Sequence, residues 1–256
     1  MVPAMAEFLL AGAWGKLVRS EYHLEALKSE LRTFLDSKPY GVTAHLDYER
    51  SRYVYYIHRV DEPVPAIPHI IGDFIHNLRS SLDHLAWQLS IQRYGGIPPE
   101  AVWREIAYPI ARSRKDFKSL QSLKHFKTEH VAFMKGFQPE HRTPNHPLVV
   151  LNELCNTDKH RTVHTALITA GDISPVFIPN DHAEILDSWY AKGQKLVVGT
   201  KCACVLFERH GPDPKVTMDS LPVNIGFGDC PDVAIGALRD IARDILNGAT
   251  EEFFGT

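Results

Sequence analysis

Residues 70–89, IIGDFIHNLRSSLDHLAWQL, carry the side chains of this chain that are best suited to chemistry. Apolar residues recur there at three- and four-residue steps, which predicts a helix with one buried stripe. The polar side of this helix carries His76, Asn77, Arg79, Ser80, Asp83 and His84. It carries no Lys or Glu, although solvated helix faces are usually built from charged side chains of this kind. We therefore expect this side to face other protein or a cleft.

Histidine and arginine on this face could act together on a phosphate ester. Histidine is the side chain suited to proton transfer near neutral pH. The guanidinium of arginine stabilises a charged phosphorane without a metal ion. At 100° per residue, Arg79 and His84 lie about 140° apart around the helix axis, with His76 and Asp83 between them. A site here is therefore broad and needs a second helix to complete it.

A second polar cluster, NELCNTDKHR at residues 152–161, is the candidate for that second helix. Two Asn residues and His160 are spaced by four, so they share one edge of the helix. Lys159, His160 and Arg161 fall in its last turn. A helix C-terminus favours cations through its dipole, so capping is the alternative interpretation of these three residues.

The six residues from Arg79 to His84, RSSLDH, fit the pattern R-x4-H. On this motif the chain resembles the HEPN superfamily of helical-bundle ribonucleases and nucleotide-binding domains. The wider helix, together with NELCNTDKHR, is also similar to a group of uncharacterised bacterial proteins. In HEPN ribonucleases the motif forms a metal-independent site, usually paired across a dimer, that cleaves RNA through its own 2′-hydroxyl. The resemblance implies that Arg79 holds the phosphate and that His84 transfers the proton.

The predicted function is therefore metal-independent RNA cleavage of the kind found in bacterial defence and toxin systems. The residues predicted to act in catalysis are Arg79, His84, His76, Asp83 and His160, and those predicted to hold phosphate beside them are Asn77, Lys159 and Arg161. No cofactor and no resident metal ion are expected. RNA and a second copy of this chain are the expected partners.

Residues 112–142 form a basic segment that favours an anionic partner. Eight Lys and Arg side chains stand there against three Asp and Glu, which gives a local charge of +5 in a chain whose net charge is -3. If RNA binds, Lys115, Lys118, Lys124 and Lys127 are the expected contacts to phosphate, which give affinity without sequence selection. The alternative is an ordinary solvated surface loop.

Two other functions fit the same residues. In a non-catalytic binding or regulatory protein, the His, Asp and Arg side chains would satisfy one another as a polar seam between packed helices. In a metal-dependent hydrolase, the ligands would come from His76, Asp83, His84, Asp158, His160 and His164. Such residues suit Zn, Mn or Fe, and helical bundles hold sites of this kind. The sequence contains no H-E-x-x-H or E-x-x-H motif, so no metal site is predicted.

The order of the predicted elements gives an α+β fold in a single domain, residues 1–256. Alternating apolar residues predict an N-terminal β-hairpin over residues 42–60, and residues 106–111, IAYPIA, are strand-like. The predicted helical core consists of residues 4–37, 66–94, 145–161 and 231–247. A C-terminal antiparallel β section, residues 162–228, precedes the final helix.

The overall composition limits the classes of protein further. Four cysteines in 256 residues are too few for a disulfide-stapled secreted scaffold. The apolar run FLLAGAW near the N-terminus is too short to span a bilayer and lacks the basic residues that precede a signal sequence. We therefore expect a cytoplasmic protein without membrane association.

Overall fold

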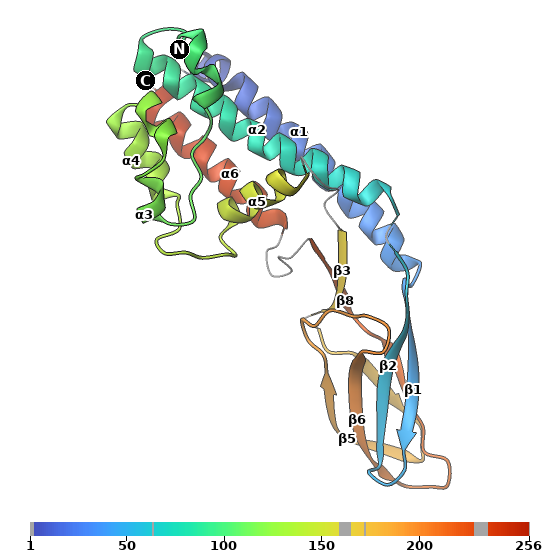
Figure 1. The fold of residues 1–256 in the computed structure, drawn as a ribbon. Helices are drawn as coiled ribbons and strands as arrows, with labels where there is room; N and C mark the ends of the chain where they lie inside the picture. Colours follow the sequence, from blue (N-terminus) through green and yellow to red (C-terminus); the bar gives the residue numbers. More distant parts are fainter. Residues whose placement is uncertain (1–2, 63, 159–164, 172, 228–234, 256) are drawn as a thin grey trace. The chain divides into compact units, whose positions relative to one another are not determined.

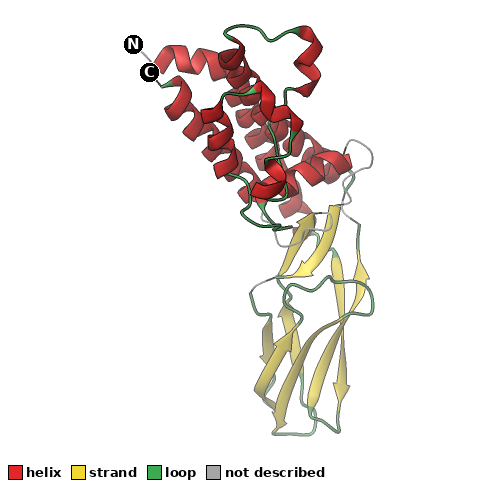
Figure 2. Cartoon of the chain, turned by 60° about the vertical axis from the view of Figure 1, so that its left-hand side comes forward, coloured by secondary structure: helices red, strands yellow, loops and turns green. Residues whose placement is uncertain are grey.

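The computed structural model describes residues 3–62, 64–158, 165–171, 173–227 and 235–255. The chain divides into two compact units (Figure 1). The helical unit consists of Met1–Ser29, Ala66–Val163 and Asp232–Thr256, and the β unit of Glu30–Pro65 and His164–Pro231. Figure 2 shows the helices in the first unit and the strands in the second.

The structure confirms the α+β class and the antiparallel pairing of the strands. The single domain predicted from the sequence stays a prediction, because two compact units can belong to one domain or to two. None of the described helices has a stretch that is both long and apolar enough to cross a membrane.

Helix α2, Ala66–Tyr94, supplies the largest buried stripe of the helical unit. Pro68 is tolerated because it lies in the first turn, where backbone N–H groups have no partner within the helix. Gly95 ends the helix with a positive φ of 69°, and the Gly96 amide donates to the Ile91 carbonyl at 3.1 Å. This is the glycine-based ending common at helix C-termini. The fully buried apolar side chains of α2 include Ile71, Phe74, Leu78, Leu82, Leu85 and Leu89.

Helix α2 packs against α5, Pro147–Asp158, and α6, Ile235–Ala249, which also pack against each other. A Cβ added at Gly72 would lie 2.8 Å from the Asp158 carboxylate, so the small residue allows this approach. The Cys155 thiol donates to the Ile75 carbonyl at 3.5 Å. Cys155 is buried in this contact, which fits a structural thiol better than a nucleophile.

Helix α1, Pro3–Asp36, begins in the helical unit and continues into the β unit. Its Gly12 lies against His84 of α2, and its Glu21 forms an ion pair with Arg243 of α6. The final helix α6 is followed by a π-helical turn, Thr250–Phe254. Gln92 of α2 donates to the Phe253 carbonyl at 3.1 Å and so ties this turn to the central helix.

The segment between α2 and α5 consists of short helices and extended loops. These helices are η1, Glu100–Glu105; α3, Arg114–Phe117; η2, Gln121–His125; and α4, Thr128–Gly136. The strand predicted at residues 106–111 is wrong, since those residues form no strand. Side chains satisfy their backbone instead: the Tyr108 amide donates to Asp83 at 2.9 Å, and the Ala111 amide donates to Gln138 at 2.9 Å.

The β unit contains a four-stranded antiparallel sheet in the order β1-β2-β6-β5. Its strands are β1, Tyr40–Asp47; β2, Arg52–Val60; β6, Lys201–Arg209; and β5, Ala183–Tyr190. The N-terminal hairpin β1–β2 thus joins the C-terminal β section through the pairing of β2 with β6. Two further antiparallel pairs are β4, Val176–Pro179, with β7, Val216–Ser220, and β3, Thr165–Ala170, with β8, Val223–Phe227.

Aromatic side chains of β2 join this sheet to the β4–β7 pair. The Tyr55 hydroxyl donates to the Val216 carbonyl at 2.7 Å, and the Tyr55 ring lies 5.7 Å from the ring of Phe177. Burial raises the pKa of Tyr55, so this hydroxyl stays protonated and remains a donor. Alternate residues of β2 therefore face a core between the two sheets.

Candidate functional site

Arg79 and Asp83 on α2 form a clamp around the backbone of Tyr108. The Arg79 Nη2 atom lies 3.0 Å from Asp83 Oδ1 and donates to the Tyr108 carbonyl at 2.8 Å. Asp83 in turn accepts the Tyr108 amide at 2.9 Å. One ion pair, between two residues one helical turn apart, thus binds both backbone groups of Tyr108. Charge-assisted hydrogen bonds of this kind are stronger than neutral ones.

The surroundings of the clamp favour a structural role for Arg79. Its side chain is only 17 % exposed, and its Nη1 atom is buried without a hydrogen-bond partner among the described residues. The Tyr108 side chain below it is fully buried, and burial raises the pKa of Tyr108. Two of the three Arg79 nitrogens are therefore committed to protein groups rather than directed at solvent.

The histidines predicted for catalysis lie elsewhere on α2. His76 and His84 are both exposed. The Nε2 atom of His76 lies 3.5 Å from the Ser80 hydroxyl on the same helix. His84 lies against α1, where a Cβ added at Gly12 would come within 2.6 Å of its Nδ1 atom. The structure thus joins Arg79 to Asp83 and to Tyr108, and among the described residues Arg79 and His84 have no shared partner.

The other residues predicted for this site are divided between the core and residues that are not described. Asn77 is buried and donates to the carbonyl of Asp73 at 2.8 Å, so its amide stabilises α2 itself. Lys159, His160, Arg161 and His164 lie outside the described residues. Within the part of the chain that is described, His76, Asp83, His84 and Asp158 do not gather into a group that could share one metal ion.

The four lysines predicted to contact phosphate fall into two pairs. Lys124 forms an ion pair with Glu105 at 2.7 Å, and Lys127 approaches Glu129 at 3.8 Å. Lys115 and Lys118 are exposed, and neither forms an ion pair with any described residue. The second pair is therefore the more available to an anion.

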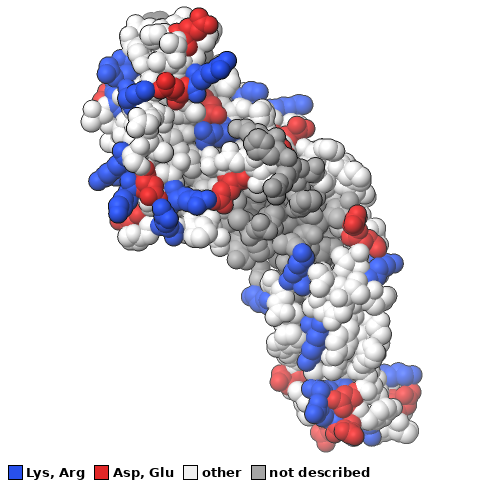
Figure 3. Space-filling model, viewed as in Figure 1, with Lys and Arg blue, Asp and Glu red and all other residues white. Residues whose placement is uncertain are grey.

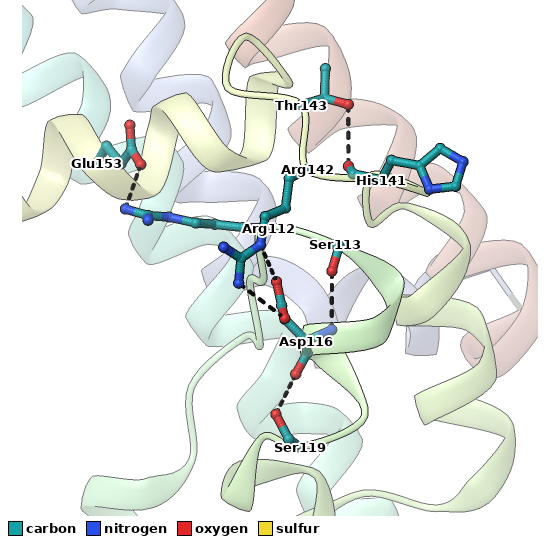
Figure 4. A network of polar contacts seen from close by, with 8 residues as sticks. All are labelled: Arg112, Ser113, Asp116, Ser119, His141, Arg142, Thr143 and Glu153. Carbon is teal, nitrogen blue, oxygen red and sulfur yellow. Dashed lines mark hydrogen bonds and ion pairs between the residues drawn. The ribbon is translucent and has the colours of Figure 1, made fainter.

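A pocket of about 240 Å³ opens beside the same basic segment. Figure 4 shows four of its lining residues, Arg112, Arg142, Thr143 and Glu153, within a network of polar contacts. Its lining residues are Arg112, Arg142, Thr143, Pro144, Val149 and Glu153. Arg112 and Arg142 come from the two ends of the basic segment, whereas Val149 and Glu153 come from α5. The two guanidinium groups give the pocket several donors suited to an oxyanion, whereas the Thr143 hydroxyl already donates to the His141 carbonyl at 3.2 Å.

Each guanidinium of the pocket is held by one carboxylate. Arg112 Nη2 lies 3.1 Å from Glu153 Oε1, and Arg142 Nε lies 3.3 Å from Asp116 Oδ2. The Arg112 and Arg142 side chains nevertheless remain 69 % and 73 % exposed. Hydrogen bonding with Ser113, and then with Arg142, lowers the pKa of Asp116, so this carboxylate stays ionised as a partner. The arginines are thus oriented while most of their donors stay open.

The clamp on Tyr108 also helps to fix the position of Arg112 at the surface. Asp83 and Gln138 bind the amides of Tyr108 and Ala111, and Gln138 donates to the Pro109 carbonyl at 3.1 Å. Arg112 follows directly and is exposed. Residues 108–111, held by Asp83 and Gln138, therefore link α2 to Arg112 at the pocket.

The sequence indicated the basic segment but not the pocket arginines. The local charge predicts lysines as phosphate contacts, whereas the charged residues that line a pocket are Arg112, Arg142 and Glu153. Arginine binds oxyanions through a planar fork and is the better choice on chemical grounds alone. The pairing of Arg112 with Glu153 joins residues 41 apart and has no local signal in the sequence.

Comparison with known proteins assigns no family to this arrangement. No protein-family model matches the chain, no curated protein matches it in sequence, and no solved structure matches it in fold. The resemblance to HEPN ribonucleases therefore rests on the R-x4-H motif from Arg79 to His84 and stays a prediction.

The substitution Asp83→Ala tests whether the clamp is structural. It leaves Arg79 without its ion-pair partner and the Tyr108 amide without its acceptor, so we expect a loss of about 1–3 kcal/mol in the free energy of unfolding. Ser80→Ala, on the same helix, is the matched control and should stay within about 0.5 kcal/mol of the wild type. Urea denaturation measures both. Equal stability of the two variants would contradict the clamp.

Proposed function

We propose that the helical unit is an RNA-binding module that holds the phosphate backbone at the pocket formed by Arg112 and Arg142, without reacting with it. The observation that carries the proposal is the pair of exposed guanidinium groups on one pocket, each held from one side by a carboxylate. An arginine so held presents its remaining N–H donors in a fixed orientation. A phosphate can accept two parallel hydrogen bonds from such a fork.

The charge around the pocket favours a chain of phosphates over a single small anion. Figure 3 shows Lys and Arg side chains gathered over the part of the helical unit where α3 lies, interleaved with Asp and Glu. Lys115 and Lys118, in and directly after α3, are exposed. They are close in sequence to Arg112 and extend the positive charge beyond the pocket. Successive phosphates of one strand could bind the pocket and these lysines together.

The chemistry of the pocket favours binding over catalysis. Arginine stays protonated at any physiological pH, so it stabilises charge but transfers no proton. Thr143 is a weak acid, and Glu153 is already paired with Arg112. In the same proposal, the clamp of Arg79 and Asp83 has a structural role and positions the pocket. The proposal keeps the cytoplasmic location that the sequence predicts.

The double variant Arg112→Gln/Arg142→Gln should bind a single-stranded RNA more weakly than the wild type in EDTA. Two lost phosphate contacts should also reduce the slope of log K against log salt by about 1.4, since each contact contributes about 0.7 for single strands. Fluorescence anisotropy over a series of salt concentrations measures both quantities. Arg93→Gln, at the exposed end of α2, is the matched control. An unchanged affinity and slope in the double variant would refute the pocket as the binding site.

RNA cleavage is the second candidate function, and the exposure of His76 and His84 favours it. Both imidazoles are free of buried ion pairs in the described residues and could reach a substrate on the α2 surface. By resemblance to HEPN ribonucleases, Arg79 would hold the phosphate and His84 would transfer the proton, with the site paired in a homodimer. This chemistry requires Arg79 to contact phosphate through the donors left by Asp83 and Tyr108.

This second candidate predicts that the wild type cuts a structured RNA in EDTA and leaves 2′,3′-cyclic phosphate ends. His84→Ala should abolish the cut with little change in melting temperature, because His84 is exposed. His141→Ala, another exposed histidine, is the matched control and should cut like the wild type. Gel analysis of end-labelled RNA is the measurement. RNA that stays intact with the wild type would eliminate cleavage and leave binding as the function.

A further inference from the structure

Two carboxylates oppose each other at one end of the β unit. Glu184 of β5 and Glu208 of β6 are direct partners in the antiparallel register. Side chains of direct partners lie on the same face of a sheet with their Cβ atoms about 4.5–5.5 Å apart, and like charges in such a pair are destabilising. Both residues are exposed, and neither forms an ion pair with a Lys or Arg among the described residues. No Lys or Arg side chain among the described residues pairs with either carboxylate to offset this repulsion.

A histidine completes the group. His210 lies two residues beyond Glu208, so the two side chains extend from the same face of the sheet. The His210 amide donates to the His182 carbonyl at 3.0 Å, which continues the β5–β6 pairing past the end of β6. The His210 Nε2 atom lies 3.1 Å from Glu184 Oε2. Three residues from two strands therefore converge, and the backbone pairing of the strands positions all of them.

We propose that Glu184, Glu208 and His210 bind one Zn²⁺ ion. One ligand atom from each residue lies within 4.8 Å of the other two. Tetrahedral zinc with ligands at about 2.0–2.2 Å separates its ligand atoms by about 3.3–3.6 Å, so the side chains must close by little more than an ångström. All three are exposed and can make this adjustment by rotation about their side-chain bonds. Water takes the fourth position.

The ligand types select the class of metal. One imidazole and two carboxylates suit zinc better than calcium, which takes oxygen ligands only and in larger number. The two negative charges of Glu184 and Glu208 balance the charge of the ion. The neighbouring Arg209 does not take this role, because its guanidinium lies over the Tyr48 ring at 4.7 Å. The site uses no residue of the Arg112–Arg142 pocket, so it is independent of the proposed RNA binding.

The test uses the full chain and Zn²⁺ as the only added metal. Isothermal titration gives the number of Zn²⁺ ions bound and their affinities for the wild type, Glu208→Gln and His210→Ala. Glu49→Gln, which removes an exposed carboxylate in the turn between β1 and β2, is the matched control. Thermal denaturation of the same four proteins, with Zn²⁺ and with EDTA, gives a second and independent readout.

We expect the wild type and Glu49→Gln to bind one Zn²⁺ ion per chain at this site. Glu208→Gln and His210→Ala should lack this bound ion at the same metal concentration. Loss of a ligand should weaken binding by more than about 100-fold, which exceeds the effect of losing an outer-shell partner. In EDTA, Glu208→Gln should melt at the same temperature as the wild type or at a higher one, because the repulsion between the two carboxylates is gone. Added Zn²⁺ should raise the melting temperature of the wild type but not that of Glu208→Gln. Equal Zn²⁺ binding by the wild type and both site variants, or no binding by the wild type, would overturn the proposal.

Discussion

One carboxylate and one guanidinium on α2 hold the backbone on which the candidate site depends. Asp83 accepts the amide of Tyr108 and Arg79 donates to its carbonyl, so a residue with no strand partner has both backbone groups satisfied. Buried backbone groups without partners cost as much as a lost hydrogen bond, which explains why an ion pair is found here. Gln138 repeats the arrangement at Pro109 and Ala111, and Arg112 follows at the surface.

Two kinds of arginine result, and burial separates them. Arg79 is mostly buried and bound to Asp83 and Tyr108, so its removal would first lower the stability of the local packing rather than affect a catalytic step. Arg112 and Arg142 are largely exposed and oriented by Glu153 and Asp116. In water such surface pairs add little stability, because solvent screens them. Their effect is to fix the direction of the guanidinium groups, which is what recognition of a phosphate requires.

The sequence predicted the local features of this fold and missed the long-range ones. Periodic apolar residues gave the full extent of α2, residues 66–94, and alternation gave the hairpin β1–β2. Residues 106–111 resemble a strand in sequence because they are apolar, but the amides of Tyr108 and Ala111 donate to side chains, Asp83 on α2 and Gln138 beyond α4. The pairing of β2 with β6 and the contact of Arg112 with Glu153 join distant residues and leave no periodic pattern. Polar residue types on α2 suggested catalysis, although the burial of Arg79 and the hydrogen bond from the Tyr108 amide to Asp83 favour a structural role for this pair.

The central claim is that the ion pair of Arg79 and Asp83 positions the segment that leads to the pocket. Amide hydrogen exchange of residues 106–112 tests it most directly, in the wild type and in Asp83→Ala. If the claim holds, exchange in this segment accelerates in the variant by at least about tenfold, equivalent to about 1.4 kcal/mol of local stability, while exchange in α5 is unchanged. Exchange in residues 106–112 that is the same in both proteins would contradict it.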